Sequence, residues 1–345
     1  MTTLPKRTFT NPRAAHGFRG RPCSILAVGS YVPENVLTNA DLEKMVDTSD
    51  EWITTRTGIK ERHIAAPTEF TSDLAVKAAR RALERTDLKP EQIDLVIVAT
   101  ITPDMPFPAT ACLVQEKIGA VRAAGFDIEA ACSGFIYGLE IGQQFIMSRT
   151  YNTVLVIAAE KLSTITDWSD RNTCVLFGDG AGAAVLQNRP EAHGLLTVCM
   201  GADGSKAGLL LMPGGGSRCP ATAESVGKRM HFLRMEGREV FKSAVNSMYN
   251  AALESLRRCS LDIRQIKCVI PHQANQRIIE AVGERLGVQD GQMFVNLHRY
   301  GNTSAASVAI ALDEAVSSGR IERGDLILLM VFGAGLTWGA AVIEW

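Results

Sequence analysis

The sequence predicts an α/β protein made of two similar halves that pack face to face. Short apolar runs typical of buried strands alternate with segments of helical periodicity along a chain of 345 residues. The order strand, helix, strand-turn-helix, strand occurs twice at a spacing of about 170 residues, which is too long for a solenoid and indicates a duplicated unit. The length also exceeds what one hydrophobic core usually supports, which is compatible with two fused halves.

We expect three regions along the chain. Residues 1–22 form a basic extension, 23–195 the first half and 196–345 the second half. The extension contains no acid, and its basic residues are Lys6, Arg7, Arg13, Arg19 and Arg21. A short flexible segment is the favoured interpretation, while an organelle transit peptide stays open.

The first half starts with a strand at 24–29, followed by a helix for which Asn39 is the expected N-cap. One or two helical turns at 49–58 end at Gly58, because glycine readily closes a helix in the left-handed conformation. Further helices are expected at 72–86, from 110 and at 133–146, and strands at 93–100, 126–129 and 152–158. A glycine-rich turn at 177–182 leads into one more strand.

The second half repeats this order after a loop rich in Gly, Ser and Pro at 201–231. A long helix is expected at 237–258, strands at 266–270, 294–297 and 326–332, and a helix at 304–316. The uncharged run 326–343 is long enough to cross a membrane, but Gly333, Gly335 and Gly339 interrupt it. It therefore predicts two buried strands joined by a glycine turn rather than a membrane span.

The composition favours a soluble globular protein that binds neither nucleic acid nor membrane. Hydrophobic residues make up 46% and charged residues 21%, and the formal net charge of −1 provides no field for a polyphosphate. The eight cysteines are scattered without metal-type spacing, which indicates free thiols in a reducing compartment. The glycine-rich turn lacks the spacing of a dinucleotide site, and Gly227-Lys228 lacks the pattern of a P-loop.

One cysteine has the setting of a nucleophile. The short run at 126–129 breaks at two alanines, presents Cys132 and continues as an apolar helix. A thiol at a helix start faces unpaired backbone N–H groups and the positive end of the helix dipole, which together favour the thiolate. An inert core cysteine is the alternative, since most buried cysteines are structural.

Polar segments follow buried strands in the second half, at 271–277 and 298–307. Taken alone, His272 fits a hydrogen-bonded core histidine, and Asn302 fits a turn residue beside glycine. Both residues follow predicted strands in the second half, and Cys132 follows a predicted strand in the first half. α/β proteins form their sites at such strand ends. The three side chains are therefore expected to converge.

Four motifs carry a resemblance to a known family. They are Ala-Cys-Ser-Gly-Phe at 131–135, Pro-His-Gln-Ala-Asn at 271–275, Gly-Asn-Thr-Ser-Ala-Ala-Ser at 301–307 and Phe-Gly-Ala-Gly-Leu-Thr-Trp-Gly at 332–339. With these motifs the chain resembles β-ketoacyl-acyl-carrier-protein synthase III from about residue 24 to its end. The resemblance implies a thiolase fold, with two duplicated halves in a layered αβαβα arrangement, and a cytoplasmic homodimer that starts type II fatty acid synthesis.

The resemblance further implies decarboxylative condensation of an acyl-CoA, most often acetyl-CoA, with malonyl-acyl-carrier-protein. Cys132 would carry the acyl group, while His272 and Asn302 would donate hydrogen bonds to the thioester oxygen of the decarboxylating malonyl group. The backbone N–H of Ala334 would stabilise the oxyanion on the acyl-cysteine, and Phe332 would lie beside the malonyl carboxylate. Neither a cofactor nor a metal is expected, because the coenzyme A thioester is a substrate.

By the same resemblance, Trp52 and Arg171 would enclose the adenine of coenzyme A, with Arg56 near its phosphates. The remaining implied positions are the carrier-protein contacts Lys242, Gln273 and Arg277, and the acyl-pocket residues Phe107, which would reach across the dimer, and Phe177. From the residues alone, Trp52 and Arg56 fit a surface cation–π pair equally well, and Lys242 fits a solvated helix charge.

Three other functions stay open at this point. A same-fold enzyme of a quinolone, polyketide or 3-hydroxy-3-methylglutaryl-CoA pathway would use another acyl donor or acceptor. Cysteine, histidine and asparagine also form a cysteine-protease set, in which the histidine lies beside the thiol as its base. A noncatalytic scaffold that binds the carrier protein would not need Cys132.

Overall fold

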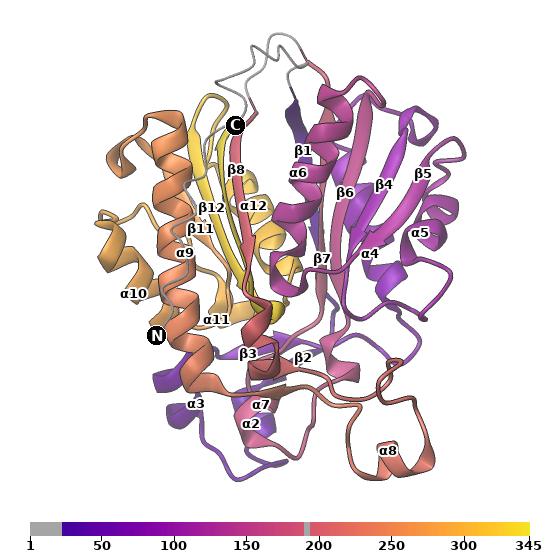
Figure 1. Ribbon diagram of the computed structural model, residues 1–345, viewed down its shortest axis with the longest axis vertical. Coiled ribbons are helices and arrows are strands. Elements are labelled where there is room, and N and C mark those ends of the chain that lie inside the picture. Colours follow the sequence, from indigo (N-terminus) through magenta and orange to yellow (C-terminus); the bar gives the residue numbers. More distant parts are fainter. Residues whose placement is uncertain (1–22, 190–193) are drawn as a thin grey trace.

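The computed structural model of the chain describes residues 23–189 and 194–345. The basic extension expected over 1–22 lies outside the described residues. Two sheets stand side by side, with helices between them and on both outer faces (Figure 1). This is the layered αβαβα arrangement that the resemblance predicted.

The first sheet contains the strands of the N-terminal part of the chain. In spatial order they are β1 (Ser24–Tyr31), β7 (Gly180–Gln187), β6 (Thr153–Glu160), β4 (Leu95–Ala99) and β5 (Ala124–Ile128). β4 runs parallel to β5 and β6, whereas β7 is antiparallel to β6 and β1. Every residue of β4 and β6 is buried, which explains why both segments are almost unbroken apolar runs in the sequence.

The second sheet repeats the arrangement of the first. In spatial order it consists of β11 (Cys268–Pro271), β12 (Leu326–Gly333), β13 (Thr337–Glu344) and β8 (Leu195–Ala202). β12 is parallel to β11 and antiparallel to β13, which in turn is antiparallel to β8. These strands therefore correspond in order and direction to β4, β6, β7 and β1 of the first sheet.

The strand predicted at 294–297 is not formed. This segment would be the counterpart of β5, but the pairing is limited to a single parallel bridge between Val269 and Met293, the residue just before the segment. The backbone N–H groups of Asn296 and Leu297 donate instead to the side-chain oxygen of Gln273. A side chain thus takes the place of a neighbouring strand, and the chain turns into a short helix.

The longer helices form three layers. Their bounds are α2 (Asn39–Leu42), α3 (Asp50–Thr57), α4 (Thr71–Leu83), α5 (Thr110–Ile118), α6 (Gly134–Met147), α7 (Arg171–Cys174), α8 (Ala223–Gly227), α9 (Gly237–Cys259), α10 (Gln276–Leu286), α11 (Leu297–Tyr300) and α12 (Ala306–Ser317). α4 and α5 cover the outer face of the first sheet, and α9 covers that of the second, with α10 beside it. α6 and α12 lie between the sheets (Figure 1).

α6 packs closely on the first sheet because of its glycines. A β-carbon on Gly138 would lie 2.7 Å from a methyl carbon of Val156, and one on Gly142 would lie 2.8 Å from a methyl carbon of Leu186. These glycines are four residues apart and so share one face of the helix. Close packing of this face fixes the position of the helix start, where Cys132 lies.

Two shorter features differ from the sequence prediction. The N-cap of α2 is Thr38, whose hydroxyl accepts from the backbone N–H of Asp41, and not Asn39. The Asn39 side chain is buried and binds the carbonyl of Ile59 and the guanidinium of Arg62. The loop predicted at 201–231 contains the end of β8, the one-turn helix α8 and β9 (Leu210–Leu211), which pairs with β10 (Arg234–Met235).

The uncharged C-terminal run forms the hairpin β12–β13 that the glycines predicted, with Gly335 at a φ of 120° in its turn. β2 (Val36–Thr38) and β3 (Glu61–His63) form a further antiparallel pair. Among residues 23–189 and 194–345, none of the helices is both long and apolar enough to cross a bilayer.

Candidate active site

A cavity of about 1100 Å³ contains the three side chains that the sequence singled out. Cys132, His272 and Asn302 all line it. They come from the turn before α6, the end of β11 and the turn before α12. Each is less than a tenth exposed, at 8%, 5% and 7% respectively, so substrate must enter the cavity to meet them.

Cys132 lies in a tight turn between β5 and α6. The 3₁₀ turn Ala131–Ser133 leads directly into the helix, and Ala131 before the thiol has a left-handed φ of 44°. The end of β12 presses against this turn, because a β-carbon on Gly333 would lie 2.8 Å from the backbone nitrogen of Cys132. Only glycine permits this approach, which brings the β12–β13 turn beside the thiol.

Burial, and not the helix start, dominates the ionisation of Cys132. It raises the pKa of the thiol to about 12, while contact with the Ser304 hydroxyl acts in the opposite direction. The helix position was therefore a correct prediction, but the thiolate that it was expected to favour is not the resting form.

His272 is held by Ser307. Its Nδ1 lies 2.6 Å from the Ser307 hydroxyl, which also accepts from the backbone N–H of Gln273. The Ser307 hydroxyl can donate its own proton to Nδ1, and in that tautomer the ring proton resides on Nε2. Burial lowers the pKa of His272 to about 4, so the imidazole is neutral at pH 7, and in this tautomer its Nε2–H group is left to donate into the cavity.

Asn302 is fixed by its own loop and by the first half. Its backbone N–H donates to the carbonyl of Leu176, and its carbonyl accepts from the N–H of Gly178, so the two halves join here. Its side-chain Oδ1 accepts from the N–H of Ser304 at 2.9 Å. With the oxygen occupied, the amide NH₂ is the group left to donate into the cavity.

The other predicted residues of the reaction centre also line the cavity. Phe332 and Phe177 are buried in its wall, at 4% and 6% exposure. Ala334 lies in the 3₁₀ turn between β12 and β13 and lacks the positive φ of Gly335, the next residue. An alanine therefore fits this position without backbone strain.

The predicted coenzyme A residues lie together at the cavity. Trp52 and Arg56 line it, and the Arg56 guanidinium is 4.5 Å from the Trp52 ring centroid. Arg171 does not line the cavity, but its guanidinium lies 5.0 Å from the same ring and donates to the carbonyl of Asp47. Both arginines therefore stack on the tryptophan at the cavity rim.

The predicted carrier-protein contacts differ in their settings. Lys242 and Arg277 are exposed and line the cavity. Gln273 is 1% exposed, and its amide donates to the carbonyls of Pro271 and Phe294. The surface role predicted for Gln273 is wrong, because its side chain is used to shape the loop behind His272.

Phe107 lies outside the cavity of its own chain. It is 83% exposed, which is unusual for an aromatic side chain. The structure therefore does not bring Phe107 together with the other predicted site residues.

Sequence reasoning missed four polar residues at the site. Arg238 lines the cavity near Lys242 and adds a further exposed cation. Ser304 contacts the Cys132 thiol, and Ser307 holds His272. The fourth is a buried glutamate, Glu160, which accepts from the Ser304 hydroxyl. The two serines belong to a quoted motif, but only the fold shows what they contact.

Comparisons with known proteins identify the relatives of this chain. Family models described as 3-oxoacyl-[acyl-carrier-protein (ACP)] synthase III and as its C-terminal part match residues 126–204 and 256–345. A β-ketoacyl-[acyl-carrier-protein] synthase III from Caldanaerobacter subterraneus subsp. tengcongensis is 60% identical over 321 residues, which cover 93% of this chain and 97% of that protein.

Solved structures give the same result. The 3-oxoacyl-[acyl-carrier-protein] synthase III from Aquifex aeolicus VF5 matches with a TM-score of 0.88 at 50% identity, over 94% of this chain and all (100%) of that one. The priming β-ketosynthase of the R1128 polyketide biosynthetic pathway matches with a TM-score of 0.87 at 38% identity, over 94% and 96%. The chain belongs to the β-ketoacyl-acyl-carrier-protein synthase III family of condensing acyltransferases, which have the thiolase fold.

Proposed function

We propose that the protein condenses an acyl-CoA primer, acetyl-CoA above all, with malonyl-acyl-carrier-protein. The products would be 3-oxoacyl-acyl-carrier-protein, coenzyme A and CO₂, and the reaction would start type II fatty acid synthesis in the cytoplasm. The observation that carries this proposal is the single cavity lined by Cys132, His272 and Asn302.

In the first half-reaction, the sulfur of Cys132 attacks the thioester carbonyl of the primer. The bond from this carbon to the sulfur of coenzyme A then breaks, leaving an acyl-cysteine. The oxyanion formed on the way would be stabilised by the backbone N–H groups of Cys132 and Ala334. Gly333 supports this pairing, because it brings the β12–β13 turn against the Cys132 backbone. Loss of one such donor typically slows a reaction by about 10²- to 10³-fold.

In the second half-reaction, malonyl loses CO₂ and its thioester oxygen becomes negative. Nε2–H of His272 and the NH₂ group of Asn302 would donate to this oxygen, since their other polar atoms are already occupied. The apolar ring of Phe332 would disfavour the charge of the malonyl carboxylate and so promote its loss as CO₂. The resulting carbanion attacks the acyl carbonyl on Cys132, the carbon–sulfur bond to Cys132 then breaks, and 3-oxoacyl-carrier leaves while the cysteine sulfur is set free for the next cycle.

The same two residues argue against a cysteine protease. In that class the asparagine orients the histidine ring and the histidine deprotonates the thiol. Here Ser307 holds Nδ1 of His272, whereas the side-chain oxygen of Asn302 binds the backbone of Ser304. The Cys132 thiol contacts the Ser304 hydroxyl.

The rim of the cavity supports the choice of partners. The Trp52 ring with its two arginines would bind the adenine and phosphates of coenzyme A. An adenine between Trp52 and Arg171 requires the guanidinium to move outward, because the present 5.0 Å to the ring centroid accommodates no third ring. Lys242, Arg277 and Arg238 would attract the acidic carrier protein, as a local basic patch does in an otherwise neutral protein.

We further propose a homodimer in which Phe107 enters the acyl pocket of the partner. The ring of Phe107 is 83% exposed in the single chain, which supports a contact with a second chain. Sedimentation velocity would measure the assembly state, and Phe107→Ala should alter the preferred primer if the ring shapes that pocket.

The decisive experiment follows CO₂ release and product mass. Malonyl-acyl-carrier-protein labelled at its free carboxyl is mixed with acetyl-CoA and the protein, with Cys132→Ala as the control that lacks the nucleophile. We expect labelled CO₂ and 3-oxobutyryl-carrier from the wild type only. If the folded wild type yields neither, the proposed function is rejected. Mass spectrometry of the acyl-enzyme after exposure to mixed acyl-CoAs then identifies the preferred primer.

A further inference from the structure

A buried carboxyl lies directly behind the Cys132 thiol. Glu160, the last residue of β6, is 0% exposed. One of its oxygens accepts from the Ser304 hydroxyl at 3.1 Å, and Ser304 lines the same cavity as Cys132, where its hydroxyl acts to lower the pKa of the thiol. Ser304 thus stands between the cavity that holds the thiol and the buried carboxyl, and the reaction described above assigns no task to Glu160.

The other contacts of Glu160 are uncharged. Thr102 and Thr100 donate their hydroxyls to it at 2.6 and 3.2 Å, and the backbone N–H of Ile101 donates at 3.1 Å. A buried carboxylate without a cation is costly to keep ionised. Burial accordingly raises the pKa of Glu160 to about 7, which lets it gain or lose a proton near neutral pH.

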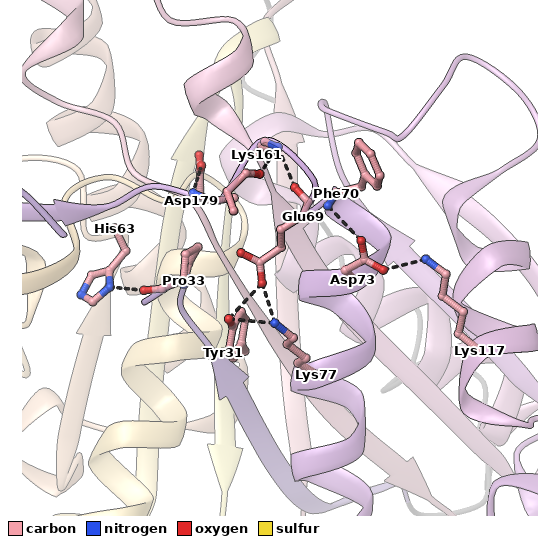
Figure 2. A network of polar contacts seen from close by, with 12 residues as sticks. Tyr31, Pro33, His63, Glu69, Phe70, Asp73, Lys77, Lys117, Lys161 and Asp179 are labelled. Atoms are coloured by element: carbon pink, nitrogen blue, oxygen red, sulfur yellow. Dashed lines mark hydrogen bonds and ion pairs between the residues drawn. The ribbon is translucent and has the colours of Figure 1, made fainter. Parts of the chain in front are cut away.

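Two charged residues on the elements around Glu160, Lys161 and Asp179, are engaged elsewhere. Lys161 donates its amine to the backbone carbonyls of Ala66 and Glu69, in the polar network drawn in Figure 2. Asp179, which precedes the strand paired with β6, accepts from the backbone of Ala65 and from Ser163.

Two loops face Glu160, one after β4 and one before α12. They present hydroxyl and backbone N–H groups to its carboxyl, and Cys132 lies on the other side of Ser304. His272, across the cavity, is neutral above pH of about 4 because burial lowers its pKa. Cys132 is therefore the titratable partner of Glu160 among the described residues.

The backbone is strained at both ends of the thiol–hydroxyl contact. Ala131, just before Cys132, has a φ of 44°, and Ser304 has a φ of 51°. Left-handed conformations are costly for residues other than glycine, and they persist where the surrounding structure imposes them. One of these residues comes from each half, the first next to the thiol and the second carrying the hydroxyl.

We propose that Glu160 receives the proton of Cys132 through the Ser304 hydroxyl when the thiol attacks the acyl-CoA. As the carbon–sulfur bond forms, the S–H bond breaks and its proton passes to Oγ of Ser304, whose own proton passes to Glu160. When the bond to coenzyme A breaks, the proton returns along the same path to the departing thiolate. The step consumes no other reactant, and it rests on the acylation half of the proposed function.

This route avoids bringing a second charge into the buried site. Before the transfer the negative charge is on Glu160, and afterwards it is on the sulfur and then on the oxyanion, so the total is unchanged. A thiol pKa of about 12 makes a resting thiolate scarce, so proton transfer must accompany attack. The acylation rate should therefore require ionised Glu160 and rise with pH up to about 7.

The test measures acylation alone, by rapid mixing with acetyl-CoA and mass spectrometry of the Cys132 peptide between pH 5.5 and 9. We expect the wild-type rate to rise about tenfold per pH unit below 7 and to level off above it. Glu160→Gln and Ser304→Ala should each lose this break and acylate about 10²-fold more slowly at pH 8. The double variant should be no slower than the slower single variant, because both act on one path.

Asp179→Asn is the matched control, since it removes another buried carboxyl whose pKa burial also raises. It should retain the break near pH 7. The proposal is overturned if Glu160→Gln keeps the break and acylates within about threefold of wild type. If that variant does not fold, the pH profile of Ser304→Ala, which leaves the carboxyl in place, decides the question. Absence of acylation in the wild type would instead reject the proposed function itself.

Discussion

At the scale of single residues, Cys132 shows how burial can outweigh a helix dipole. The dipole at a helix start is worth at most about 2 kcal/mol, or little more than one pKa unit, whereas full burial can shift a pKa by about 3 to 5 units in the opposite direction. The sequence reveals the helix start but not the enclosure of the thiol. The place of Cys132 at the helix start was therefore predicted correctly, and its ionisation was not.

His272→Ala should separate the two half-reactions. Acylation of Cys132 by acetyl-CoA should stay within about threefold of wild type, while decarboxylation of malonyl-carrier should fall about 10²- to 10³-fold, because a donor to the developing oxyanion is lost. Acyl-enzyme mass and labelled CO₂ report the two steps separately. Equal losses in both would mean that the imidazole serves the thiol instead.

The His272 ring should remain neutral far below the pH at which exposed histidines become protonated. Burial lowers its pKa to about 4, so its ring signals in a ¹H–¹⁵N NMR titration should not change between pH 8 and pH 5. The pattern should be that of the tautomer protonated at Nε2, with the His272→Ala spectrum as the assignment control among six histidines. A midpoint near 6.5 would contradict this expectation.

At the scale of elements, the strands that could be predicted were those whose unbroken apolar sequence indicates burial on both faces. β4, β6 and β12 are apolar on both faces, so periodicity and length identified them. The segment 294–297 was predicted as a strand for the same reason, but the Gln273 side chain occupies its backbone donors. The local sequence pattern does not reveal this hydrogen bond, because the two residues that form it are more than 20 positions apart.

Gly138→Ala in α6 should destabilise the protein by about 1 to 3 kcal/mol, because the new β-carbon would lie 2.7 Å from Val156 in the sheet below. Alanine gains about 1 kcal/mol in helix propensity over glycine, which is too little to offset this overlap. Urea unfolding measures the change. Gly208→Ala, where nothing lies within 4 Å of the added carbon, should stay within about 0.5 kcal/mol of wild type. Equal stability of the two variants would refute close packing of α6.

At the scale of the whole molecule, buried ionisable groups should make the free energy of unfolding depend on pH. The raised pKa of Glu160 means that the folded state holds a proton more tightly than the unfolded chain, so this contribution is present below pH 4.5 and lost as pH rises through about 7. Between pH 5 and 8, the free energy of unfolding of wild type should fall by about 2 to 3 kcal/mol relative to Glu160→Gln. Urea unfolding of both proteins at each pH gives this difference, and a constant offset would contradict it.

The sequence predicted that the three site residues lie together, because the duplicated halves place equivalent turns opposite each other. Cys132, His272 and Asn302 line one cavity, as two matching halves required. Glu160 was not predictable, since a single acid at the end of an apolar strand usually marks the return to solvent. Its partners, Thr102 and Ser304, are 58 and 144 residues away.

The backbones of Phe177 and Asn302 pair across the two halves of the fold. The Asn302 side chain is placed by a strand-like backbone contact with the opposite half as well as by its own loop. A preparation with both cores intact but this contact shifted would look compact, retain its secondary structure and yet be inert. Turnover is therefore a stricter gauge of correct assembly than any spectroscopic measure of folding.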